Sequence, residues 1–378
     1  MTRFQPFEME RLMSVWEQEV DYNLSESGVH PLSLRALLGE GADVEALLAT
    51  KLGYPEVNGT LALREHVAAL YGHGAGPDNV LVTVGCVEAL LITLQTLAED
   101  GGEVAVMLPN YMHAWGTAQN VGLEVREFHL LPEAGWALDV DELEAVVNEN
   151  TSAIAVCNPN NPTGYILTDS EMDAVVAAAE RVGAWIIADE VYAGAERLTD
   201  TQTPSFWGRY DRVLALNSLS KAYGLPGLRL GWVTAPSEML QRIWRRHEYS
   251  TLTCTMMANK LGEIALSPEV RPRILERTRA YVRNGYTLIE NWLQTFDGLF
   301  EVVAPQAAAI ALVRCHLDIA SLELTERLIR EKSVLTVPGE HFGVDRHIRL
   351  SFGPPPEYVS AGLERIGELV ATLAPVGV

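Results

Sequence analysis

The chain has 378 residues, of which 48% are hydrophobic and 21% are charged. This is the composition of an ordinary globular protein, and the length predicts two domains or one large domain with an appendage. The formal net charge of −22 argues against a nucleic-acid partner, and no apolar run reaches the roughly 18 residues that a membrane span needs.

The N-terminal part combines helical spacing with polar loops. Residues 7–20 have the apolar spacing of a helix, and a polar loop follows over 23–31. This loop is either a plain connector or the lining of a cleft, with the Gly28 backbone close to a ligand. A turn-rich stretch over 54–59 then leads into a helix over 61–71.

The first residues and the cysteines indicate the cellular compartment in which the protein is expected. The first eight residues lack the apolar core of a signal peptide, so the sequence predicts a cytoplasmic protein. The four cysteines, Cys86, Cys157, Cys254 and Cys315, lie far apart without metal or redox spacing. We expect small buried residues in a reducing compartment and no metal site.

A helix start directly follows a strand in the next segment. Residues 79–84 form a short β-branched strand, and residues 85–91 begin a helix. Free N–H groups and the helix dipole favour an anion at such a junction, here at Gly85, Cys86 and Val87. No Gly-Lys-Ser/Thr follows, so the junction is not a Walker loop.

Strands and helices alternate from about residue 79 to residue 235. Seven short apolar runs are typical of buried strands: 79–84, 103–108, 123–128, 152–157, 183–188, 212–216 and 230–234. This alternation predicts an α/β fold with a mostly parallel seven-stranded sheet. Ligands of such sheets bind beyond the carboxyl ends of the strands. The residues near those ends are Gly85, Tyr111, Asn161, Asp189, Ser218 and Lys221.

Beyond residue 236 the alternation stops. Helices are predicted over 238–247, 257–266, 269–296, 322–332 and 357–373, and strands over 299–303, 309–313, 334–337 and 347–352. This pattern predicts a smaller α+β unit. We expect an N-terminal arm over 1–45, a large cofactor-binding domain over 46–265 and a small C-terminal domain over 266–378.

One lysine lies in a Gly/Pro-rich loop between two predicted strands. Ser218 and Ser220 precede Lys221, and Arg229 follows eight residues later. Hydroxyls and a guanidinium hold a phosphate, and an amine forms an imine with an aldehyde. This combination is what pyridoxal 5'-phosphate (PLP) needs from a protein. The alternative is a surface lysine in a polar turn.

Three motifs carry a resemblance to a known family. They are Asn158-Pro159-Asn160-Asn161-Pro162-Thr163-Gly164, Ala188-Asp189-Glu190-Val191-Tyr192, and Ser218-Leu219-Ser220-Lys221 with Arg229. In this order and at these separations, the chain resembles the class I/II aminotransferases of the fold type I PLP enzymes from about residue 20 to its end. The resemblance implies transfer of the amino group of an L-amino acid to a 2-oxo acid, in a homodimer with shared active sites.

The resemblance also implies roles around the cofactor ring. Lys221 would form the imine and then move the α-proton of the substrate. Asp189 would pair with the pyridine nitrogen, so that the ring can take up carbanion charge. Asn161 and Tyr192 would donate to the phenolic oxygen, and Tyr111 would stack on the ring.

Further roles concern the phosphate and the substrate carboxylate. The groups that would hold the phosphate belong to Ser218, Ser220, Arg229, Gly85, Cys86 and Val87. Tyr54, in a Tyr-Pro-x-x-x-Gly setting, resembles the tyrosine that reaches the phosphate from the neighbouring subunit. Arg349 matches the arginine that binds the α-carboxylate, for which a bidentate guanidinium is suited.

Two stretches depart from the family pattern. Many members carry Gly-Gly and an aromatic residue where this chain has Gln306-Ala307-Ala308-Ala309-Ile310. The loop over 25–30 and the residues 31–34 after it look more like a branch that includes capreomycidine synthase. A PLP enzyme of β/γ-elimination, replacement or cyclisation in specialised metabolism therefore stays open. So does a binding protein without turnover, although the intact Lys221 argues against it.

The same loop carries a candidate specificity residue. Glu26 lies two residues before Gly28, which we expect near the substrate together with Asn161 and Arg349. A carboxylate that faces the pocket would attract an amine or guanidinium on the side chain of the substrate. The alternative is a solvated loop glutamate.

Overall fold

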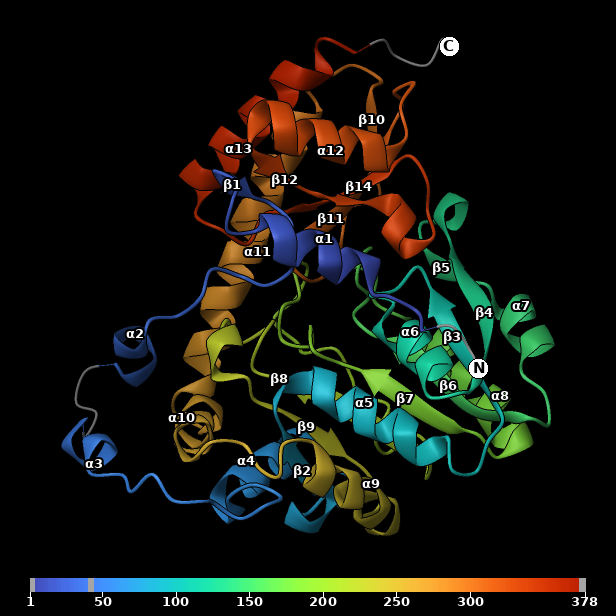
Figure 1. Cartoon of the computed structure of the whole chain (residues 1–378), viewed down its shortest axis with the longest axis vertical. Helices are drawn as coiled ribbons and strands as arrows, with labels where there is room; N and C mark the ends of the chain where they lie inside the picture. Colours follow the sequence, from blue (N-terminus) through green and yellow to red (C-terminus); the bar gives the residue numbers. More distant parts are fainter. Residues whose placement is uncertain (1–3, 40–43, 374–378) are drawn as a thin grey trace.

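A computed structural model describes residues 4–39 and 44–373. Its largest element is a mixed sheet with the strand order β2-β9-β8-β7-β6-β3-β4-β5 (Figure 1). The strands are β2 (Val80–Thr83), β3 (Glu103–Leu108), β4 (Glu124–Leu131), β5 (Ala137–Leu138), β6 (Thr151–Cys157), β7 (Trp185–Asp189), β8 (Val213–Ser218) and β9 (Gly231–Thr234). The pairs among β4, β3, β6, β7 and β8 are parallel, whereas β9 and β5 pair antiparallel with their neighbours.

Both faces of this sheet are buried. Successive side chains of a strand point to opposite faces, so Val104 and Val106 of β3 pack in one apolar cluster, and Ala105 and Met107 pack in another. A strand that is covered on both faces is a continuous apolar run. This is the physical reason why these strands can be predicted from the sequence as short apolar runs.

Helices form a layer on each face. The face of Val104 is covered by α5 (Gly85–Leu97), α6 (His113–Asn120) and α9 (Ser237–Ser250). The other face is covered by α4 (Leu61–Tyr71), α7 (Val140–Val146), α8 (Asp169–Val182) and α10 (Met256–Leu266). The doubly wound arrangement that the alternation predicts is therefore confirmed.

A second, antiparallel sheet has the strand order β10-β11-β14-β13. It consists of β10 (Phe300–Val302), β11 (Ile310–Cys315), β14 (His347–Ser351) and β13 (Val337–Pro338). The C-terminal helices are α11 (Arg271–Leu293), α12 (Ser321–Lys332) and α13 (Pro356–Val370). The long helix α11 extends from the region of the large sheet to that of the second sheet (Figure 1).

The N-terminal segment joins this C-terminal part. β1 (Tyr22–Asn23) pairs in parallel with β12 (Val334–Leu335). Helix α1 (Glu8–Trp16) lies between the two sheets in Figure 1 and buries Met9 and Met13 against Val337 and Phe342. The short helices α2 (Leu34–Leu38) and α3 (Val44–Leu48) lie at the outer edge, at the left of the figure.

The structure differs from the sequence prediction in a few elements. The large sheet has an eighth strand, β5, which is only two residues long and therefore shows no alternating pattern in the sequence. The prediction of a single strand over 334–337 is wrong, because this segment forms two short strands, β12 and β13, which pair with β1 and β14 respectively. Helix α6 was not predicted. Among the residues that the structure describes, no helix is long and apolar enough to cross a bilayer. The domain boundaries stay a prediction.

Candidate active site

A cavity of about 310 Å³ lies at the carboxyl ends of the parallel strands. It is lined by Glu10, Met13, Glu17, Glu26, Cys86, Val87, Tyr111, His113, Cys157, Asn161, Asp189, Val191, Tyr192, Ser218, Ser220, Lys221, Pro226 and Arg229. Most of the residues singled out in the sequence are therefore brought together here. Gly28, Tyr54, Gly85 and Arg349 are not among the residues that line the cavity.

Lys221 follows β8 and is half-buried in this cavity. Burial lowers the pKa of its amine, and the charge of Glu26 opposes that effect. A Cβ atom at Gly28 would lie 3.3 Å from the Ser220 carbonyl oxygen and 3.8 Å from Lys221 Cδ. Gly28 therefore packs against the lysine and supports its position. A lysine with a lowered pKa holds more neutral amine at neutral pH, which suits a nucleophile and a base.

Asp189 ends β7 and presents a carboxylate without a cationic partner. Burial raises its pKa to about 6, against the opposing effects of a hydrogen bond from the Val191 N–H and the charge of Lys221. That hydrogen bond, to Asp189 Oδ1, is 3.2 Å long. Within residues 4–39 and 44–373, no Lys, Arg or His forms an ion pair with this carboxylate. A protonated ring nitrogen would supply the missing positive charge.

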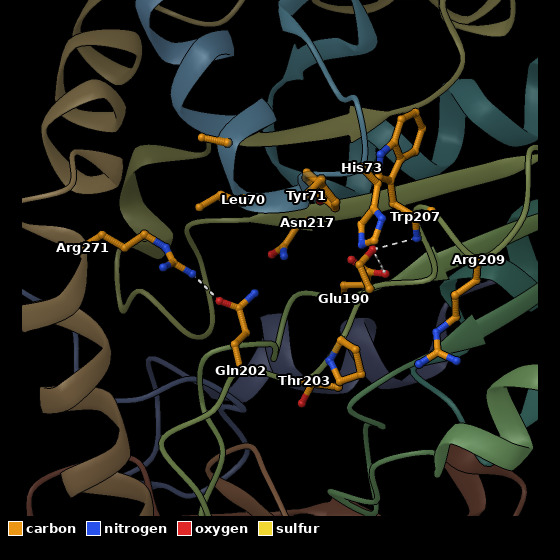
Figure 2. Close-up of a pocket in the computed structure, with 14 residues that line it drawn as sticks. Leu70, Tyr71, His73, Glu190, Gln202, Thr203, Trp207, Arg209, Asn217 and Arg271 are labelled. Atoms are coloured by element: carbon orange, nitrogen blue, oxygen red, sulfur yellow. Dashed lines mark hydrogen bonds between the residues drawn. The ribbon is translucent and has the colours of Figure 1, made fainter.

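Strand alternation separates Asp189 and Ser218 from their neighbours Glu190 and Asn217. Figure 2 shows Glu190 and Asn217 in a different cavity of about 560 Å³. Glu190 accepts hydrogen bonds there from Ser205 Oγ, 2.7 Å, and from the Phe206 N–H, 3.0 Å. Burial raises the pKa of Glu190 to about 7. The two adjacent acids thus face different surroundings, and only Asp189 reaches the lysine cavity.

The N-terminus of α5 forms a cradle for an anion. Gly85 has φ +75°, and a Cβ atom there would lie 2.7 Å from Arg229 Nη2, so only glycine lets the guanidinium approach this closely. Arg229 Nη1 donates to Ser220 Oγ at 3.5 Å. Ser218 is buried beside them. Helix N–H groups, hydroxyls and a guanidinium converge on one end of the cavity, as a phosphate requires.

Arg349 lies on β14 beside this cavity and is only 1% exposed. Its Nη1 donates to Asn161 Oδ1 at 2.8 Å, and its Nη2 donates to the Ser25 carbonyl oxygen. Its Nε has no hydrogen-bond partner within residues 4–39 and 44–373, which is costly for a buried cationic donor. A carboxylate that entered from the cavity side would offer the acceptors that the guanidinium lacks. Next to it, the Tyr192 hydroxyl donates to Ser27 Oγ at 2.9 Å.

The sequence prediction missed residues that α1 contributes. Glu10 and Met13 of α1, and Glu17 just beyond its end, line the cavity. The Tyr111 hydroxyl donates to Glu10 Oε1, and burial together with the charge of Glu10 raises the pKa of Tyr111 well above its usual value. The helix itself was predicted from its spacing. Its place over the site depends on contacts with the second sheet, for which the sequence gives no signal.

These residues fit PLP. The carboxylate of Asp189 without a cationic partner, the lysine and the anion cradle lie in one cavity. A carboxylate, an amine and an anion cradle are the groups that bind the ring nitrogen, the aldehyde and the phosphate of this cofactor. Among the described residues, no cluster of three or more His, Cys, Asp or Glu could hold a metal ion. Asn161 keeps its amide nitrogen for a ligand, because its Oδ1 is used by Arg349.

Comparison with known proteins agrees with this geometry. Residues 35–366 match the family model of aminotransferase class I and II. The chain is 30% identical to capreomycidine synthase of Streptomyces vinaceus over 93% of this chain and 90% of that protein. A PLP-dependent aminotransferase from Streptococcus suis superimposes with a TM-score of 0.92, 28% identity and coverage of 98% and 99% of the two chains. A PLP-dependent cyclase, OrfR, superimposes with a TM-score of 0.86, 26% identity and coverage of 98% of both chains.

Proposed function

This chain belongs to the class I and II aminotransferase family and its cofactor is pyridoxal 5'-phosphate, and from this premise we propose that it transfers the amino group of an L-amino acid to a 2-oxo acid. The observation that carries the proposal is the joint presence of Lys221 and Asp189 in one cavity with the buried Arg349 beside it. Bound PLP supplies an aldehyde that takes up the substrate amine and a ring that accepts the electrons of the broken Cα–H bond.

The residues of the chain then have separate tasks. Lys221 Nζ binds the cofactor and, once released, takes the α-proton and returns it at the position that completes the transfer. Asp189 keeps the ring nitrogen protonated. Arg349 binds the α-carboxylate and so fixes the Cα–H bond relative to Lys221. Asn161 and Tyr192 would hold the phenolic oxygen of the cofactor, and Tyr111 would stack on its ring.

The phosphate end and the cover of the site complete the proposal. The phosphate of the cofactor would be bound by Ser218, Ser220, Arg229 and the N-terminus of α5. These contacts would keep the cofactor in the site while it is not bonded to Lys221. Helix α1 covers the cavity and keeps bulk water away from the reacting atoms.

A second candidate function keeps the cofactor and changes the outcome. Two of the similar proteins are capreomycidine synthase and a PLP-dependent cyclase. Elimination, replacement or cyclisation on an amino acid is therefore the alternative. Both reactions would begin with removal of the α-proton by Lys221, and they would differ in which bond of the substrate changes next.

One experiment separates the two candidates. Purified holoenzyme is incubated with each proteinogenic amino acid, with and without an added 2-oxo acid, and products are identified by mass. Transamination predicts that sustained turnover requires the 2-oxo acid and that the new amino acid appears in equal amount. Sustained turnover without any 2-oxo acid, together with loss of a side-chain group or ring closure, would establish the alternative instead.

We also propose a homodimer in which each site takes residues from both chains. Tyr54 is 85% exposed and does not line the cavity of its own chain. The neighbouring Val44, Leu48 and Leu52 are also exposed apolar side chains, and α3 has no buried residue. Such a run of exposed apolar side chains favours burial against a second copy.

A reducing compartment such as the cytoplasm is also part of the proposal, because all four cysteines are free thiols.

Mixed dimers test the shared site. Tyr54→Phe removes one hydrogen bond to the phosphate, so we expect cofactor retention to weaken by about ten- to a hundredfold. Heterodimers of Tyr54→Phe and Lys221→Ala chains should regain activity, because one of their two sites contains both native residues. Activity and cofactor affinity are measured after mixing and refolding. A monomer at assay concentration in analytical ultracentrifugation would contradict the proposal.

A further inference from the structure

The cavity has an acidic wall that the proposed reaction does not use. Glu10 of α1, Glu17 next to its end and Glu26 of the loop after β1 all line the cavity that contains Lys221. They come from two segments that are separate in sequence, and both segments pack onto the C-terminal part of the chain. We refer to these three residues as the acidic wall.

The members of the acidic wall are close enough to interact. Burial raises the pKa of Glu17, and the charges of Glu26 and Glu10 raise it further. Glu10 accepts a hydrogen bond from Tyr111. In the part of the chain that the structure describes, no Lys, Arg or His forms an ion pair with any of the three. The charges of Glu26 and Glu10 also act on the nearby Lys221 and Arg349. Because the three carboxylates repel one another and none has an ion-pair partner within the described residues, they favour binding of a further cation.

A metal ion is not the cation that this wall fits. The described residues contain no group of three or more His, Cys, Asp or Glu side chains placed to hold a metal. The carboxylates thus lie around a space rather than converge on one point. An organic cation, which is larger and spreads its charge over several N–H donors, matches that arrangement.

The rest of the cavity identifies which part of a substrate meets the wall. In an amino acid, the α-amine goes to the cofactor at Lys221. The α-carboxylate goes to Arg349, whose buried Nε has no partner among the residues that the structure describes. The side chain is the only part left for the acidic wall. Because the amine, the carboxylate and the side chain of the substrate bind at three different places, a change in side-chain charge alone tests the acidic wall.

We propose that the substrate is an L-amino acid with a guanidinium or ammonium group on its side chain, which the carboxylates of Glu10, Glu17 and Glu26 bind. This inference rests on the proposed function, because it assigns the substrate class of the same site. It also predicts discrimination against acidic amino acids, whose side-chain carboxylate would be repelled by the wall.

The test compares amino acids of nearly equal shape and different charge. L-arginine and L-citrulline differ in replacement of the guanidinium by a neutral ureido group. For the holoenzyme we expect kcat/KM and the apparent affinity, from titration of the cofactor absorbance, to favour arginine by about ten- to a hundredfold. Added salt should raise the KM for arginine more than that for citrulline, because both substrates pair their α-carboxylate with Arg349 and only arginine forms a second charged pair at the wall.

Glutamine substitutions then locate the effect. Glu10→Gln, Glu17→Gln and Glu26→Gln should each reduce the arginine-to-citrulline ratio, and the triple variant should bring it near unity. Glu19→Gln is the matched control, because Glu19 is exposed, close to Glu17 and absent from the cavity lining. It should leave the ratio unchanged. The salt dependence of the wild type needs no variant, so the test holds even if a variant folds poorly.

The outcomes separate this inference from the proposed function. Comparable transamination of arginine and citrulline, with the same salt dependence for both, would overturn the acidic wall and leave the proposed function intact. An unchanged ratio in the triple variant would do the same. A holoenzyme that reacts with no amino acid, cationic or neutral, would overturn both.

Discussion

Lys221→Ala should abolish the visible absorbance band of lysine-bound cofactor and reduce turnover by on the order of a thousandfold or more. The reason is that, in the proposed reaction, this one amine both binds the cofactor and moves the α-proton. The chain has only four lysines, Lys51, Lys221, Lys260 and Lys332, so the attachment point can be assigned cleanly. Borohydride reduction of the wild-type holoenzyme followed by peptide mass analysis should find the pyridoxyl group on Lys221.

Lys260→Ala is the matched control for this experiment. Lys260 lies on α10 and pairs with Glu263, away from the cavity lining. Its replacement should leave both the absorbance band and turnover at the level of the wild type. A pyridoxyl group on Lys51, Lys260 or Lys332, or an active Lys221→Ala enzyme, would refute the assignment.

Asp189→Asn should slow removal of the α-proton by about a hundred- to a thousandfold while the cofactor stays bound. The carboxylate favours the protonated ring nitrogen, and a neutral amide does not. Cofactor retention after dialysis, turnover and the kinetic isotope effect with α-deuterated substrate are the measurements. The isotope effect should grow, because the variant makes breakage of the Cα–H bond the slow step.

The neighbouring acid supplies the control for Asp189. Glu190→Gln also converts a buried carboxylate to an amide, one residue further along the chain. The amide oxygen can still accept from Ser205 and Phe206, and the side chain lies in the other cavity (Figure 2). We expect nearly normal rates from Glu190→Gln. Near-normal rates from Asp189→Asn, or an equal loss in both variants, would mean that the ring nitrogen does not depend on Asp189.

The sequence by itself determined the α/β fold and the cofactor. The strands of the large sheet are continuous apolar runs, because helices cover both faces. Parallel strands place their carboxyl ends at one edge, so Asp189 at the end of β7 and Ser218 at the end of β8 had to lie near each other. Local motifs at those ends therefore predicted that Lys221, Asp189 and the two serines lie close together, and they line one cavity.

Only the tertiary structure decided what surrounds these residues. Arg349 meets Asn161 across 188 positions of sequence, and Glu10 meets Tyr111 across 101. Both contacts depend on how the second sheet packs, through Met9 and Met13 of α1, Val337 and Phe342. Such packing is non-local and leaves no period or motif in the chain. The sequence thus specifies the chemistry of the cofactor site, whereas the walls that face the substrate arise from long-range apolar contacts.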